Sequence, residues 1–97
     1  MTLTKQSFEN IHDNAFAIFF DLDNAISSEL IEVKAINSHT LAEGQAEPFS
    51  LVFQVKDDRV FEQNTFKIQH EELGDLELFL VPIGADKNGV SYEAVFT

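Results

Sequence analysis

The chain has 97 residues, is 44% hydrophobic, and carries 17 acidic against 6 basic residues, which gives a formal net charge of −11. This length predicts a single domain over residues 1–97 with one modest hydrophobic core. The negative charge repels phosphate backbones and anionic lipid, so we expect neither a nucleic acid nor a membrane as the partner.

Cysteine is absent, which excludes disulfides, thiolate zinc sites and a cysteine nucleophile. The longest apolar runs, residues 15–20 and 78–83, are too short to span a bilayer, and no apolar stretch follows a basic start at the N-terminus. We therefore expect a cytoplasmic protein, and the same features are compatible with incorporation into an exported particle.

The N-terminal part of the chain predicts a helix and then a strand. Thr4 is suited to cap a short helix within residues 4–11, with Phe8 facing the core. Residues 14–20 follow as a strand with apolar residues on both faces, which is typical of burial on both sides or of an interface on one side.

The middle of the chain predicts three further strands. Apolar and polar residues alternate over 29–35, 49–56 and 65–70, as expected for strands with one buried face. Residues 37–48 are mostly polar and contain a glycine and a proline, which predicts a loop.

The last third predicts a β-hairpin. Residues 76–83 and 90–96 are rich in apolar side chains, and the segment between them ends in Asn88-Gly89. This dipeptide tolerates positive φ and matches the twist of a hairpin turn. Pro82 cannot donate to the ladder, so we expect its strand to lie at an edge or to contain a bulge.

These elements predict an all-β fold, in which a small antiparallel meander of about six strands closes into a barrel or folds into a sandwich, with a short N-terminal helix. A single sheet cannot bury both faces in so short a chain. Either the sheet closes on itself or some apolar surface meets another chain. Our candidate interface residues are Phe16, Phe19 and Phe20, and alternation places Phe19 and Phe20 on opposite faces.

Few residues are suited to catalysis or metal binding. His12, His39 and His70 lie far apart without metal-ligand spacing, so we expect no metal site. Asp21 and Asp23 begin like a calcium loop, but an isoleucine stands where that loop needs glycine. There is no nucleophile elbow and no glycine-rich phosphate loop. We expect no catalytic residues and no cofactor.

Three segments resemble a family of small bacterial proteins classified only as a domain of unknown function. The segments are EPFSLVF at 47–53, HEELGDLELFLVPIG at 70–84 and YEAVF at 92–96. Residues 12–46 contribute little to the resemblance, which implies no activity and favours an accessory protein of a phage-tail-like or surface assembly. His70, Glu77 and Glu93 are polar positions of this pattern, and we hypothesise that they form a polar cluster that organises the hairpins.

We expect a non-catalytic protein-interaction or structural domain that self-associates or docks onto a larger assembly. An alternative is a small-ligand binding module that uses a barrel mouth lined by Phe side chains. An enzyme would need His70 or His39 beside a carboxylate in a cleft. We place any functional surface around residues 14–20 and the 37–48 loop.

Overall fold

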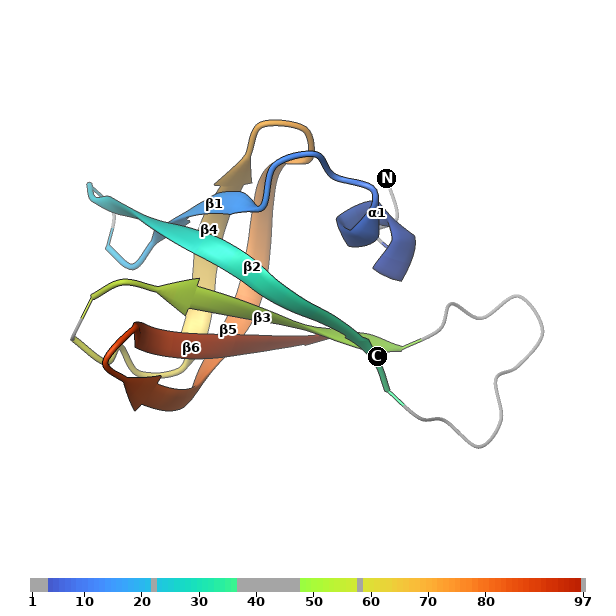
Figure 1. The fold of residues 1–97 in the computed structure, drawn as a ribbon. Coiled ribbons are helices and arrows are strands. Elements are labelled where there is room, and N and C mark those ends of the chain that lie inside the picture. Colours follow the sequence, from blue (N-terminus) through green and yellow to red (C-terminus); the bar gives the residue numbers. More distant parts are fainter. Residues whose placement is uncertain (1–3, 22, 37–47, 58, 97) are drawn as a thin grey trace.

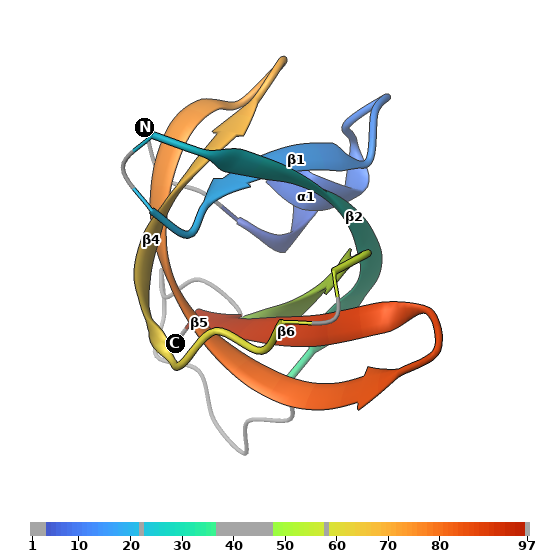
Figure 2. The ribbon, with the colours of Figure 1, turned by 90° about the vertical axis from the view of Figure 1, so that its left-hand side faces the viewer.

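Six antiparallel strands close into a small barrel, with one short helix at one end of it (Figures 1 and 2). The computed structural model describes residues 4–21, 23–36, 48–57 and 59–96. The elements are α1 (Lys5–Glu9), β1 (Ala15–Phe19), β2 (Ala25–Ala35), β3 (Phe49–Val55), β4 (Asn64–His70), β5 (Gly74–Asp86) and β6 (Gly89–Phe96). The prediction of an antiparallel all-β fold is confirmed, and the closed barrel decides against the sandwich.

The barrel is built from two three-stranded halves, β1–β3 and β4–β6. The strand order is β1-β2-β3-β6-β5-β4, so β3 pairs with β6 and β1 pairs with β4 to close the ring. In each half the long middle strand is bulged, between Leu30 and Glu32 in β2 and between Pro82 and Gly84 in β5. The bulge that Pro82 predicts is therefore present, and such irregularities bend a strand around a barrel.

Strand pairing separates an inner from an outer face. Phe53 of β3 lies opposite Tyr92 of β6, and both side chains are buried in the barrel interior. Neighbouring residues alternate in and out, as pleated strands require. The buried apolar core is Phe8, Phe16, Ile18, Leu30, Phe49, Leu51, Phe53, Val55, Phe66, Ile68, Leu78, Leu80, Val90, Tyr92 and Ala94.

Helix α1 covers one end of the barrel (Figure 1). Thr4 precedes the helix, and its main-chain N–H donates to Ser7 Oγ at 3.1 Å. Phe8 is buried, with its ring centroid 5.9 Å from that of Phe49 and 5.7 Å from that of Phe96. The helix is shorter than predicted, and its main packing residue is the predicted Phe8.

A second aromatic cluster fills the opposite end. The Phe20 ring stacks on Phe61 with the centroids 4.3 Å apart, and it also contacts Phe66 and Tyr92. The Tyr92 hydroxyl accepts a hydrogen bond from the main-chain N–H of Phe61 at 3.0 Å. These rings therefore contact one another at the end of the barrel where a Phe-lined ligand-binding mouth would lie.

The closing hairpin is longer than predicted. β5 continues to Asp86 and β6 begins at Gly89, which leaves Lys87 and Asn88 as the turn. Among the described residues only glycines have positive φ, so Asn88 is not left-handed, whereas Gly89 has φ = 123°. The Asp86 carboxylate accepts from the Asn88 N–H at 2.7 Å and so fixes this turn.

Candidate functional site

The three predicted interface residues lie in β1 or directly after it, and they do not share one face of the barrel. Phe16 is buried, with its ring centroid 5.1 Å from that of Phe53, and Phe20 belongs to the aromatic cluster at the far end. Phe19 lies half-buried on the outer face, with the Lys67 ammonium 5.4 Å from its ring centroid. Phe16 is thus a core residue rather than an interface residue, because closure of the barrel covers the face that carries it.

His70 is a buried residue with three main-chain partners. Its Nδ1 accepts from the N–H groups of Glu72 and Leu73 at 3.0 and 3.2 Å. The other nitrogen, Nε2, must therefore carry the proton, and it donates to the Asp13 carbonyl oxygen at 2.6 Å. The ring also lies on Phe16, with centroids 4.3 Å apart. These contacts support a structural role that joins the β4–β5 turn to the start of β1.

The hypothesis of a polar cluster of His70, Glu77 and Glu93 is wrong. His70 lies in the interior, whereas Glu77 lies opposite the exposed Lys67 on the outer face. Glu93 lies between the buried Tyr92 and Ala94 in β6, which turns its side chain outward. Strand alternation thus separates side chains that the shared sequence pattern grouped together.

His12 pairs with a carboxylate at the surface. His12 is exposed, and both its N–H and its Nδ1 lie within 3.1 Å of Glu72 Oε1. The hydrogen bond from the His12 N–H lowers the pKa of Glu72. His39 and the predicted functional loop, apart from Pro48, lie outside the described residues. Among the residues that the structure describes, no group of three His, Asp or Glu side chains is arranged to hold a metal ion.

Large apolar side chains are exposed on the outer face of the half of the barrel formed by β4–β6. Phe79 and Ile83 of β5 and Val95 of β6 are 52%, 51% and 53% exposed, and we call these three residues the β5–β6 outer patch. Val81 lies opposite Glu93, and Phe79 and Val95 are each two residues further along their strands from this pair. Alternation in the sequence already places Phe79 on the face opposite Leu78 and Leu80, whereas the exposure of Ile83 follows from the bulge.

An apolar groove adjoins this patch. β4 pairs with β5 only as far as Leu80, and beyond that point β5 pairs with β6 alone. The groove has a volume of about 280 Å³. Its lining residues are Val60, Pro82, Ile83, Gly84, Ala85 and Val90.

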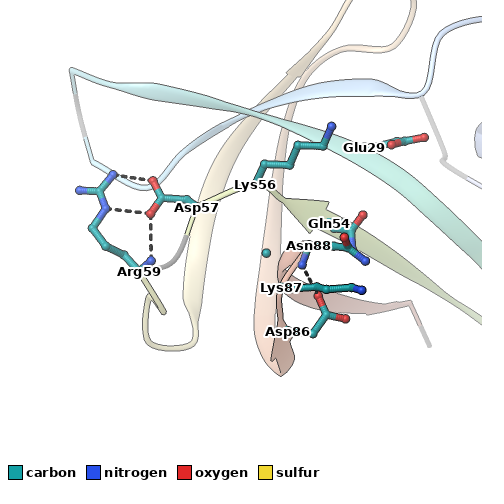
Figure 3. A pocket seen from close by; sticks show the side chains of 9 residues that line it. Glu29, Gln54, Lys56, Asp57, Arg59, Asp86, Lys87 and Asn88 are labelled. Atoms are coloured by element: carbon teal, nitrogen blue, oxygen red, sulfur yellow. Dashed lines mark hydrogen bonds and ion pairs between the residues drawn. The ribbon is translucent and has the colours of Figure 1, made fainter.

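A polar cleft of about 850 Å³ lies on the other side of the hairpin tip (Figure 3). Arg59 binds the Asp57 carboxylate through Nε and Nη2 at 3.1 and 2.8 Å, which holds the pKa of Asp57 at about 2. Within the described ranges, Lys56 and Lys87 form no hydrogen bond or ion pair. The lining residues are Glu29, Gln54, Lys56, Asp57, Arg59, Asp86, Lys87, Asn88 and Gly89.

Fold and surfaces together define a small six-stranded β-barrel domain with a filled interior and an apolar outer patch. The chain belongs to the family described as Domain of unknown function (DUF6916), which matches residues 3–96. The match includes residues 12–46, which carry little of the sequence resemblance. No curated protein and no solved structure matches the chain. In the described part of the chain, no helix is long and apolar enough to cross a membrane.

Proposed function

We propose that the chain is a non-catalytic protein-interaction domain that docks onto a partner protein through the β5–β6 outer patch. The observation that carries this proposal is the exposure of Phe79, Ile83 and Val95. Fully burying a side chain of this size contributes roughly 1.5–3 kcal/mol. A partner that covers the three side chains is therefore favoured by the hydrophobic effect.

The outer patch is not needed to complete the core. The barrel interior is filled by its own side chains, and both ends are occupied by aromatic clusters around Phe8 and Phe20. The rings near Phe20 contact one another, and the two surface hollows beside the hairpin are lined by other residues. These contacts favour the interaction domain over a ligand-binding module with a Phe-lined mouth.

The net charge of −11 supports a protein as the partner rather than a nucleic acid or an anionic membrane. The resemblance to a family of small bacterial proteins of unknown function, which we associate with phage-tail-like or surface assemblies, favours a role as an accessory domain of such a particle. In that setting the exposed patch would meet a neighbouring component of the particle.

The proposal is tested by capture from a lysate of the source cells with wild-type protein and three variants. We expect Phe79→Ser and Val95→Ser to lose a partner that wild-type protein retains. Ile31→Ser is the matched control, because Ile31 is 48% exposed on β2, away from the patch. Binding that survives both patch substitutions, or a chain that is a clean monomer in light scattering and captures no partner from the lysate, would contradict the proposal.

A further inference from the structure

We infer that Asn88 is a site of spontaneous covalent modification, at which the side-chain amide is lost and an isoaspartyl linkage to Gly89 forms in the folded protein. The inference goes beyond the proposed function and does not depend on it, because water is the only co-reactant that it needs. It is carried by the residue that follows Asn88, by the exposure of Asn88 and by the contacts of its side chain.

Asn88 is the only asparagine in the sequence that is followed by glycine. The modification begins when the main-chain nitrogen of the next residue attacks the side-chain carbonyl carbon of asparagine, and a side chain on that next residue hinders the approach. Glycine has no Cβ atom and reaches more main-chain conformations than other residues. The other asparagines precede isoleucine, alanine, serine or threonine, so the sequence singles out Asn88.

The structure leaves the side chain of Asn88 accessible to water. Asn88 is exposed in the turn between β5 and β6, where it lines the polar cleft (Figure 3). Its main-chain N–H donates to Asp86 Oδ1 at 2.7 Å, whereas its side-chain amide has no hydrogen-bond partner among the described residues. The side-chain carbonyl carbon can therefore rotate toward the main-chain nitrogen of Gly89.

Two other asparagines lie in surroundings that oppose the reaction. Asn24 donates through Nδ2 to both carboxylate oxygens of Asp21, at 3.2 and 3.3 Å, and these contacts hold its amide. Asn64 is exposed, and its Oδ1 accepts from the N–H of Thr65 at 2.8 Å, but the branched side chain of Thr65 crowds that nitrogen. Asn64 is therefore the matched internal control, because it is exposed like Asn88 and is followed by a bulkier residue.

The chemistry needs only water and involves no oxidation or reduction. The main-chain nitrogen of Gly89 forms a bond to Cγ of Asn88 and gives up its proton, while the bond from Cγ to the side-chain nitrogen breaks and ammonia leaves. The product is a succinimide ring. Water then opens this ring, and attack at Cγ gives an aspartate at position 88. Attack at the main-chain carbonyl carbon gives isoaspartate, in which the main chain runs through Cγ.

The modification changes the turn between β5 and β6. Either product adds a negative charge close to the Asp86 carboxylate, and like charges repel. Isoaspartate also lengthens the main chain by one atom, which disturbs the pairing of Asp86 with Gly89 at the end of the hairpin. Gly89 has little room to move, because an added Cβ atom there would overlap the Val55 carbonyl oxygen. We therefore expect the tip of the hairpin to loosen while β6 stays paired with β3.

The inference is tested by incubating the folded full chain at neutral pH and then cleaving it after glutamate, which yields the peptides 63–71 and 78–93. We expect the amide of Asn88 to convert to the acid at least about tenfold faster than that of Asn64, which corresponds to about 1.4 kcal/mol in the activation free energy. Mass spectrometry measures both conversions, and fragmentation by electron transfer distinguishes isoaspartate from aspartate. Asn88→Gln is the negative control, because glutamine would have to close a larger ring that forms more slowly.

Amide NMR spectra of the same samples report the effect on the turn. We expect the signals of Asp86 and Gly89 to shift in step with the mass change, while that of Phe53 in β3 stays in place. Equal rates at Asn88 and Asn64, or conversion of Asn88 only after unfolding in urea, would overturn the inference. A product that contains aspartate but no isoaspartate would overturn it as well, since the succinimide ring opens at both carbonyl carbons.

Discussion

The Nε2 atom of His70 lies 2.6 Å from the carbonyl oxygen of Asp13, a residue 57 positions earlier in the chain. Nδ1 of the same ring accepts hydrogen bonds from two main-chain N–H groups of the β4–β5 turn. One buried imidazole therefore satisfies main-chain groups of two separate segments, next to the pair of strands, β1 and β4, that closes the barrel.

Replacing His70 with alanine should lower the melting temperature. The substitution leaves the Glu72 and Leu73 N–H groups and the Asp13 carbonyl without their partner, and it removes a ring that packs on Phe16. We expect a loss of roughly 2–4 kcal/mol in the free energy of unfolding, measured by urea denaturation. His12→Ala is the control and should change stability little, because His12 is exposed. An unchanged melting temperature in His70→Ala would count against the structural role.

Gly89 should not tolerate a side chain. Its φ of 123° is rarely adopted by other residues, and an added Cβ would overlap the Val55 carbonyl oxygen of the neighbouring strand. We expect Gly89→Ala to lower the free energy of unfolding by more than about 1 kcal/mol. Gly84→Ala is the matched control, since a Cβ there meets nothing within 4 Å. Equal stability of the two variants would show that the geometry of the turn is wrong.

The sequence predicted strands where apolar and polar residues alternate, as in β4, although β3 is buried on both faces from Phe49 to Phe53. Alternation identified the strand that carries Phe49 and Phe53 and the strand that carries Phe66, and it placed Phe79 outward. Pro82 has no main-chain N–H to donate to the ladder, and this indicated an edge or a bulge, of which the bulge is present. These features are local, so they can be recognised without knowing which strands pair.

Features that depend on pairing were not predictable from one sequence. Whether Phe16 faces a core or a partner depends on closure between β1 and β4, which joins residues far apart in the chain. The groove beside β5 depends on the β4–β5 pairing ending at Asn64↔Leu80, and strand ends are weakly marked in sequence. The prediction of a polar cluster around His70 was wrong because the shared sequence pattern does not show which face of the barrel a residue occupies.

Phe8 should be essential for closing one end of the barrel. It is the buried residue of α1, and its ring lies within 6.4 Å, between centroids, of Phe16, Phe49 and Phe96. We expect Phe8→Ala to cost about 3–5 kcal/mol in the free energy of unfolding. Phe79→Ala is the matched control and should cost far less, since Phe79 is exposed. If the two losses were equal, α1 would not be part of the core.

The carboxyl group of Asp57 should titrate at about pH 2, well below the ordinary value of 3.8. The cause is hydrogen bonding, first from the Arg59 guanidinium and then from the Arg59 N–H. Because the pKa is lowered in the folded state, the contribution of Asp57 to stability is present above pH 3.8 and is lost as the pH falls from 3.8 through about 2. The side-chain carbon signal of Asp57 in NMR spectra measures this titration directly.

Arg59→Gln separates the two donors. The variant keeps the main-chain N–H but loses the guanidinium, so the pKa of Asp57 should rise from about 2 toward 3.8 and stay below it. Arg59→Lys keeps the positive charge without the two-point contact and should give an intermediate value. If the pKa stayed at about 2 in Arg59→Gln, the main-chain hydrogen bond rather than the guanidinium would hold the Asp57 carboxylate in place.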